Sequence, residues 1–116
     1  MAHNRGELSR AQAWYEKSLA LKEECGDRPG LVLSYGMLAM LAEDCKSPLQ
    51  ALFFLIRAIA LFPDFPHPLT RSAPAHLARL TASLGMPALE ATWQQVTGHP
   101  LPPNVRAYVE ATTAPA

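Results

Sequence analysis

The residues of this chain that could carry out chemistry are few and stand apart. The four histidines are scattered along the sequence, and they do not gather into the three or four ligands that a zinc ion requires. The sequence also lacks a glycine-rich phosphate loop and a Gly-x-Ser-x-Gly nucleophile motif. We therefore expect no metal site, no cofactor and no catalytic residue. The four histidines are His3, His67, His76 and His99.

The two cysteines, Cys25 and Cys45, are the remaining candidate nucleophiles. A catalytic thiol needs a neighbouring base and a third group that orients the base. Cys45 instead follows Glu43 and Asp44, whose negative charges disfavour the reactive thiolate. Each cysteine falls near the end of a predicted helix, so we expect two small buried thiols rather than a disulfide.

The composition argues against two classes of partner. Ten Lys and Arg residues balance ten Asp and Glu residues, so no net charge attracts nucleic acid or an anionic membrane. The longest apolar run, residues 51–62, contains Arg57 and is far shorter than the ~20 residues of a membrane span. The first residues lack the apolar core of a secretory signal, which predicts a cytoplasmic location.

Apolar residues recur along the chain at three- and four-residue steps, which predicts helices. Most of the histidines and cysteines are therefore expected to lie on helices or in the connections between them. Gly26, Gly85 and Gly98 each follow the predicted end of a helix, and Asp27 is a natural cap for the helix that comes next. We expect an all-α fold. Its helices are predicted over residues 6–25, 29–45, 48–62, 73–84 and 87–97, with a short last helix from Pro103.

Three segments carry local signals of their own. Residues 47–50, Ser-Pro-Leu-Gln, fit a capping box, in which the serine hydroxyl accepts a backbone N–H and the glutamine reaches back. Three prolines between residues 63 and 68 predict an extended connection after the third helix. Residues 112–116 are expected to form a flexible tail behind a single domain over residues 1–111.

The sequence contains an internal repeat, because residues 5–21 can be laid over residues 46–63. In this alignment Ala11 matches Ala51, 40 residues later. Similarity at a period between about 20 and 50 residues indicates stacked helical hairpins. The other matched pairs are Tyr15 with Leu55, Ser18 with Ala58, and Leu21 with Leu61.

These matched positions resemble the second helix of tetratricopeptide repeats, in which small residues around a bulky one let two hairpins approach closely. The 40-residue period exceeds the usual ~34 and is similar to the longer repeats of kinesin-light-chain type. The resemblance covers residues 5–63. It implies a short right-handed solenoid of antiparallel helical hairpins with about five to six helices, in which residues 69–111 form capping helices. The residues that resemble the first helix of a repeat are Tyr35, Leu38, Ala39 and Ala42.

The resemblance implies a binding surface as well. In this family the first helices line a concave groove, and the matching groove here would be apolar with an acidic end. Such a groove suits an amphipathic or basic-ended peptide. An alternative stays open, in which Leu33 and Met40 are covered by the fourth helix or by a second copy of the chain. The implied groove residues are Leu33, Gly36, Met40, Glu43 and Asp44.

The chain begins at what resembles the second helix of a repeat, so the helix that would cover its apolar face is missing from the pattern. We expect a second copy to supply this cover, which predicts a homodimer. The residues expected to mediate self-association are Leu8, Ala11, Trp14 and Tyr15. The function expected from the sequence is therefore a non-catalytic module for protein interaction or assembly. Two alternatives remain, a small helical enzyme with an unrecognised site and the C-terminal piece of a larger tetratricopeptide sensor protein.

Overall fold

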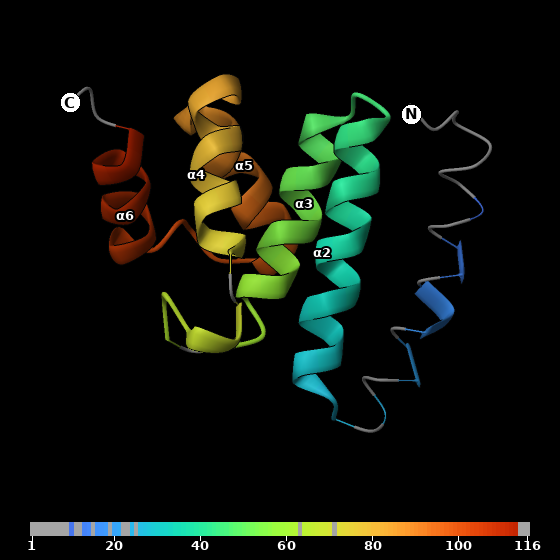
Figure 1. Cartoon of the computed structure of the whole chain (residues 1–116). Helices are drawn as coiled ribbons and strands as arrows, with labels where there is room; N and C mark the ends of the chain where they lie inside the picture. Colours follow the sequence, from blue (N-terminus) through green and yellow to red (C-terminus); the bar gives the residue numbers. More distant parts are fainter. Residues whose placement is uncertain are drawn as a thin grey trace.

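The structure is a computed structural model of the chain, and Figure 1 shows its course. It describes residues 10, 13–14, 16–18, 20–21, 24, 26–62, 64–70 and 72–113. Within these residues the regular structure is helical and contains no strand, which confirms the all-α class. The elements are α2 (Arg28–Asp44), α3 (Pro48–Ile59), the 3₁₀ helix η1 (Pro68–Thr70), α4 (Ala73–Leu84), α5 (Met86–Thr97) and α6 (Pro103–Thr113).

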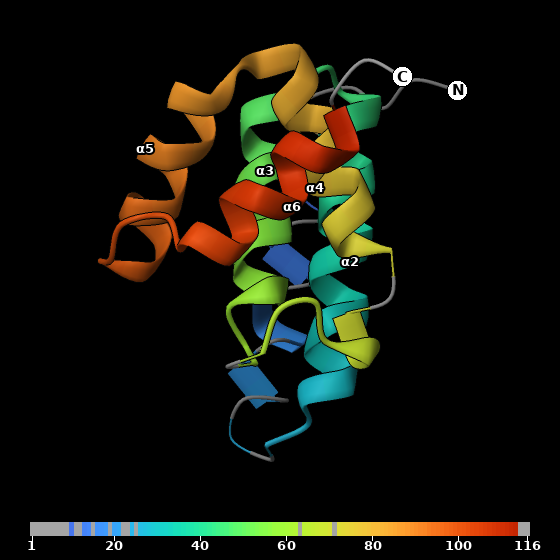
Figure 2. The same cartoon turned by 90° about the vertical axis from the view of Figure 1, so that its left-hand side faces the viewer.

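Helix α3 is the centre of the molecule, because it packs against α2, α4 and α5. In Figure 1 it lies between α2 and α4, and Figure 2 shows α5 on the side of α3 away from α2. Helix α6 packs against α4 at the far end. A helix enclosed on several sides must be apolar on most of its surface, and the sequence of α3 meets this requirement. Its buried residues are Ala51, Leu52, Phe54, Leu55, Ile56, Ala58 and Ile59.

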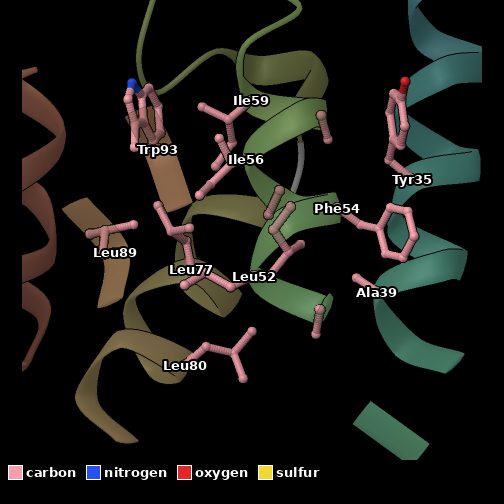
Figure 3. Packing of buried hydrophobic residues seen from close by; sticks show 14 of the residues in the cluster. Tyr35, Ala39, Leu52, Phe54, Ile56, Ile59, Leu77, Leu80, Leu89 and Trp93 are labelled. Atoms are coloured by element: carbon pink, nitrogen blue, oxygen red, sulfur yellow. The ribbon is translucent and has the colours of Figure 1, made fainter. Parts of the chain in front are cut away.

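The hydrophobic core is continuous across these helices. Figure 3 shows Phe54 of α3 facing Tyr35 and Ala39 of α2, while Leu52 of α3 faces Leu77 of α4. The charged residue of α3, Arg57, is exposed and lies over the ring of Tyr35, 5.2 Å from its centroid. The cation therefore stays in water while α3 keeps its apolar surface inside.

The helix boundaries follow local chemistry in most places. The Asp27 carboxylate accepts a hydrogen bond from the backbone N–H of Gly30 at 3.1 Å, as expected of an N-cap. Gly98 ends α5 with a positive φ of 77°, a conformation that glycine adopts without strain. No described helix is both long and apolar enough to cross a membrane.

The expected capping box at residues 47–50 is not formed as predicted, because the Ser47 side chain makes no cap hydrogen bond. Backbone bonds close this turn instead. The N–H of Ser47 donates to the carbonyl of Ala42 at 2.8 Å, and Lys46 takes a positive φ of 58°. Cys45 lies in the same turn and is half-buried, so the expectation of a buried thiol is wrong for this residue.

The connection from α3 to α4 is folded, so the prediction of an extended segment is wrong. Helix α3 ends at Ile59, three residues before the predicted end at residue 62. The rings of Phe62 and His67 stack with centroids 4.1 Å apart. The backbone N–H of Leu69 then donates to Nδ1 of His67 at 3.1 Å, which holds the start of η1. This stack and this hydrogen bond fold the chain back on itself within five residues.

The two ends of the chain were predicted in part. The described residues between 10 and 24 are helical, in agreement with the helix expected over residues 6–25. Cys25 and three of the four residues expected to mediate self-association, Leu8, Ala11 and Tyr15, lie outside the described residues. At the other end α6 continues to Thr113, so Thr112 and Thr113 belong to a helix rather than to the expected tail.

Candidate interaction groove

A groove of about 460 Å³ lies between α2 and α4. Helices α2 and α4 form its two walls, and α3 forms its floor. The element η1 stands across one end. Its lining includes Leu33, Gly36, Met37, Met40 and Glu43 of α2, Leu55 and Ala58 of α3, Leu69 and Thr70 of η1, and His76 of α4.

The wall formed by α2 carries large apolar side chains that the fold leaves uncovered. Leu33 and Met40 are each 60% exposed, although they lie in the middle of a long helix. Residues 33, 36, 40 and 43 follow one another at three- and four-residue steps, so they share one face of α2. The opposite face of the same helix is buried against α3 through Leu31, Leu38 and Ala42.

Four of the five predicted groove residues line this groove, namely Leu33, Gly36, Met40 and Glu43. The fifth, Asp44, is exposed at the end of α2 and does not line it. Helix α4 does not cover Leu33 or Met40, so that part of the alternative is wrong. Whether a peptide or a second copy occupies the groove stays a prediction.

Gly36 is an unusual residue for the middle of α2. A glycine in a helix interior costs about 1 kcal/mol of stability relative to alanine. Inside proteins this cost is often offset because a neighbour stands too close for a side chain. At Gly36 an added Cβ would meet nothing within 4 Å, so the folding of the described residues does not require a glycine here.

The floor and the closed end of the groove come from the core and from the α3–α4 connection. Leu55 and Ala58 are buried and present their apolar surface between the two walls. Thr70 is buried, and its hydroxyl donates to the carbonyl of His67 at 2.6 Å. Leu69 is 45% exposed and extends the apolar lining at this end.

A charged group from each wall closes the groove toward the C-terminal end of α2. Nη2 of Arg79 donates to Oε1 of Glu43 at 2.7 Å, which joins α4 to α2. The same nitrogen lies 3.2 Å from Nδ1 of His76. The acidic end predicted from Glu43 is therefore neutralised by a cation from α4, a residue that carries no sequence signal for this role.

Several described polar side chains at the groove interact with one another or with the backbone. Arg79 interacts with both Glu43 and His76, and the Thr70 hydroxyl donates to a backbone carbonyl. Among the described residues, no three His, Cys, Asp or Glu side chains gather in a way that could hold a metal ion. The described lining offers an apolar surface beside the ion pair of Glu43 and Arg79, and such a surface can bind a partner by burial of apolar area.

The groove exists because α2 and α4 scarcely touch. Helix α3 packs against both of them, but no extensive contact joins α2 to α4 directly. Helix α3 lies between them, and η1, which packs against α2, contributes Leu69 and Thr70 to the lining. The sequence did not predict Leu69 and Thr70 as groove residues, because they fall at the start of the predicted capping helices, where no groove residue was expected.

Comparisons of the chain with protein-family models, with curated proteins and with solved structures found no match. The resemblance to tetratricopeptide repeats therefore stays a prediction from the sequence.

Proposed function

We propose that this chain is a non-catalytic interaction module that binds a polypeptide partner in the groove between α2 and α4. The observation that carries this proposal is the exposure of Leu33 and Met40 inside a groove rather than on a convex surface. Scattered exposed apolar residues are normal on proteins, but apolar residues gathered along a groove are typical of sites that bind a partner. Methionine adds to this, because its flexible side chain adapts to different surfaces.

The proposal includes a tetratricopeptide-like arrangement of the helices. It is supported by the close pairing of α2 with α3 and by the burial of the small residues that the family pattern requires. Small buried residues at such positions let helices approach closely. These residues are Ala39 and Ala42 of α2 and Ala51 and Ala58 of α3.

A selection of peptides from a random display library tests this function. We expect the selected peptides to bind the wild-type chain. Their affinity for the double variant Leu33→Ser/Met40→Ser should be lower by at least about tenfold, because each substitution removes an apolar contact with the peptide. The matched control is Leu49→Ser. Leu49 is also a large exposed apolar residue, but it lies on α3 outside the groove. Equal affinity of the double variant and the control, or a selection without any binder, would contradict the proposal.

We also propose that the chain forms a homodimer through its N-terminal segment. Trp14 supports this, because its side chain is 68% exposed, and large exposed aromatic residues are enriched at protein interfaces. Light scattering across a dilution series measures the mass. We expect a dimer that Trp14→Ser weakens, and a monomer at all concentrations would remove this part of the proposal.

A further inference from the structure

A second pocket, of about 470 Å³, lies between the C-terminal end of α3, helix α5 and the start of α6. It is separate from the groove, because the two sets of lining residues have no member in common. Most of its lining is apolar or aromatic, and its volume falls in the range of about 300–1,000 Å³ that is typical of small-molecule sites. The lining includes Phe62, Phe65, Trp93, Val96, Asn104 and Val105.

Trp93 brings an unpaired hydrogen-bond donor to this pocket. The residue is only 5% exposed, and a buried indole N–H usually has an acceptor. Among the described residues none accepts a hydrogen bond from Nε1 of Trp93, whose hydrogen bond to Thr97 is made by its carbonyl. The described residues contain no fully enclosed side-chain nitrogen that lacks a partner, so Nε1 reaches an accessible surface. Figure 3 shows this atom on the side of Ile59, toward the C-terminal end of α3, where the pocket lies.

The first turn of α6 supplies further donors to the same pocket. The N–H of Arg106 donates to the carbonyl of Pro102 at 3.1 Å, so Pro102 is the N-cap residue, and its side chain has no oxygen that could cap the turn. The main-chain N–H groups of Asn104 and Val105 belong to this first turn, where a helix offers them no partner of its own. Both residues line the pocket. The start of a helix also carries partial positive charge, which favours an anion.

The donors and the rest of the lining define the ligand together. A carboxylate offers charged acceptor oxygens to N–H groups that come from different elements. The described lining contains no Asp or Glu that would repel it, and its one ionisable residue, His99, can only add positive charge. Asp64, between Phe62 and Phe65, is exposed and does not belong to the lining. Residue 63 lies outside the described residues and is a proline, which has neither a charge nor an N–H.

We propose that this pocket binds a small aromatic carboxylate, which accepts hydrogen bonds from Nε1 of Trp93 and from the first turn of α6. The ring of the ligand lies against Phe62 and Phe65. Both side chains are already held in place, because Phe62 stacks on His67 and Phe65 meets Tyr108 edge to face. Binding therefore orders little that is mobile beforehand. This site goes beyond the proposed function and does not depend on the groove.

A spectroscopic titration tests the contact with the indole directly. The probes are naphthylacetate and its neutral amide, naphthylacetamide, which share a planar apolar body and differ in charge. Trp14 and Trp93 are the two tryptophans of the chain, so nitrogen–proton correlation spectra hold two indole signals, and Trp14→Phe assigns them. We expect naphthylacetate to move the Trp93 signal downfield until it saturates. Naphthylacetamide should bind at least about tenfold more weakly, because hydrogen bonds to a charged acceptor are the stronger ones.

The substitution Asn104→Asp tests the α6 end of the site, because its effects on stability and binding have opposite signs. We expect the thermal midpoint to rise by about 2 °C, since an acidic residue in the first turn stabilises a helix. The affinity for naphthylacetate should fall at least about tenfold, because two carboxylates would meet. Gln50→Glu is the matched control. It adds the same charge to the first turn of α3, outside the pocket, so its affinity should equal that of the wild type.

A variant of the indole itself completes the test. Trp93→Phe keeps an aromatic ring and removes the N–H, so the affinity for naphthylacetate should fall about tenfold or more. Because this variant also loses buried volume, the Trp93 signal of the wild-type chain stays the decisive measurement if the variant does not fold.

The possible results separate three kinds of ligand. If naphthylacetamide binds as tightly as the acid, the pocket recognises only the apolar body and the inference is overturned. A Trp93 signal that neither probe moves overturns it too. A short peptide with a free C-terminal phenylalanine is the third probe, and if it binds while naphthylacetate does not, the assignment to a small molecule is wrong. None of these results affects the test of the groove with Leu33→Ser/Met40→Ser.

Discussion

Helix α4 borders two junctions, one with α2 across the groove and one with α6, and the two differ. The junction with α6 is filled, because Val105 and Val109 of α6 are buried. The ring of Phe65 meets Tyr108 of α6 edge to face, with centroids 5.2 Å apart. The junction with α2 is open, and large apolar side chains of α2 stay exposed in it. Both junctions adjoin the same continuous core, so a lack of apolar residues does not explain the difference.

The connections that precede α4 and α6 differ as well. Residues 98–102 lead from α5 into α6, which packs directly on α4. The connection from α3 to α4 is longer, and it contains η1, which packs against α2 and lines the groove. Helix α3 lies between α2 and α4, and no extensive contact joins these two helices directly, so the exposed apolar residues of α2 have no helix packed on them.

The largest effect that distinguishes the junctions should come from matched truncations to alanine. Val109→Ala removes two buried methyl groups from the filled junction and should lower the free energy of unfolding by about 2 kcal/mol. Leu33→Ala removes a larger side chain from the open junction, yet it should change this free energy by less than about 0.5 kcal/mol. Urea denaturation measures both. Equal losses would mean that Leu33 is covered in solution, by a second copy or by another part of the chain.

A smaller effect should come from the residue that holds the connection in place. His67→Ala removes the ring that stacks on Phe62 and the acceptor for the Leu69 N–H. We expect a loss of about 1 kcal/mol in the free energy of unfolding. Affinity for groove peptides should fall too, because Leu69 is part of the lining. Both quantities come from denaturation and anisotropy measurements on the same samples.

Two further variants at residue 67 divide this effect between its causes. His67→Asn keeps an acceptor near the Leu69 N–H and loses the aromatic stack, whereas His67→Phe keeps a ring and loses the acceptor. Each should retain part of the stability that His67→Ala loses. If His67→Ala left both stability and peptide affinity unchanged, the contacts of His67 would not be what holds η1 at the groove.

The sequence predicted the helices well because their signals are local. Periodic apolar residues, Asp27 before α2, Gly85 after α4 and Gly98 after α5 all act within one helical turn. Four of the five predicted groove residues line the groove because they share one face of α2, and helical periodicity alone determines such a face.

The sequence did not predict what lies opposite that face. The stack of Phe62 on His67 and the pairing of Arg79 with Glu43 join residues whose contact depends on tertiary structure. Prolines between residues 63 and 68 indicated an extended segment, but their restriction of φ is also compatible with the 3₁₀ helix that forms from Pro68. The capping box also failed, because the Ser47 side chain makes no cap hydrogen bond and the Ser47 N–H, which Gln50 was expected to reach, donates to the carbonyl of Ala42.

The smallest effect should come from the ion pair that joins the open junction. The side chains of Arg79 and Glu43 are 55% and 31% exposed, so their pairing should contribute about 0.5 kcal/mol or less to the free energy of unfolding. A double-mutant cycle with Arg79→Ala and Glu43→Ala isolates this coupling, and added salt should reduce it. A coupling well above 1 kcal/mol that resists salt would mean that the pair is buried in solution. The junction between α2 and α4 would then be closed around Glu43. At this end of the proposed binding groove it would be filled, as the α4–α6 junction is.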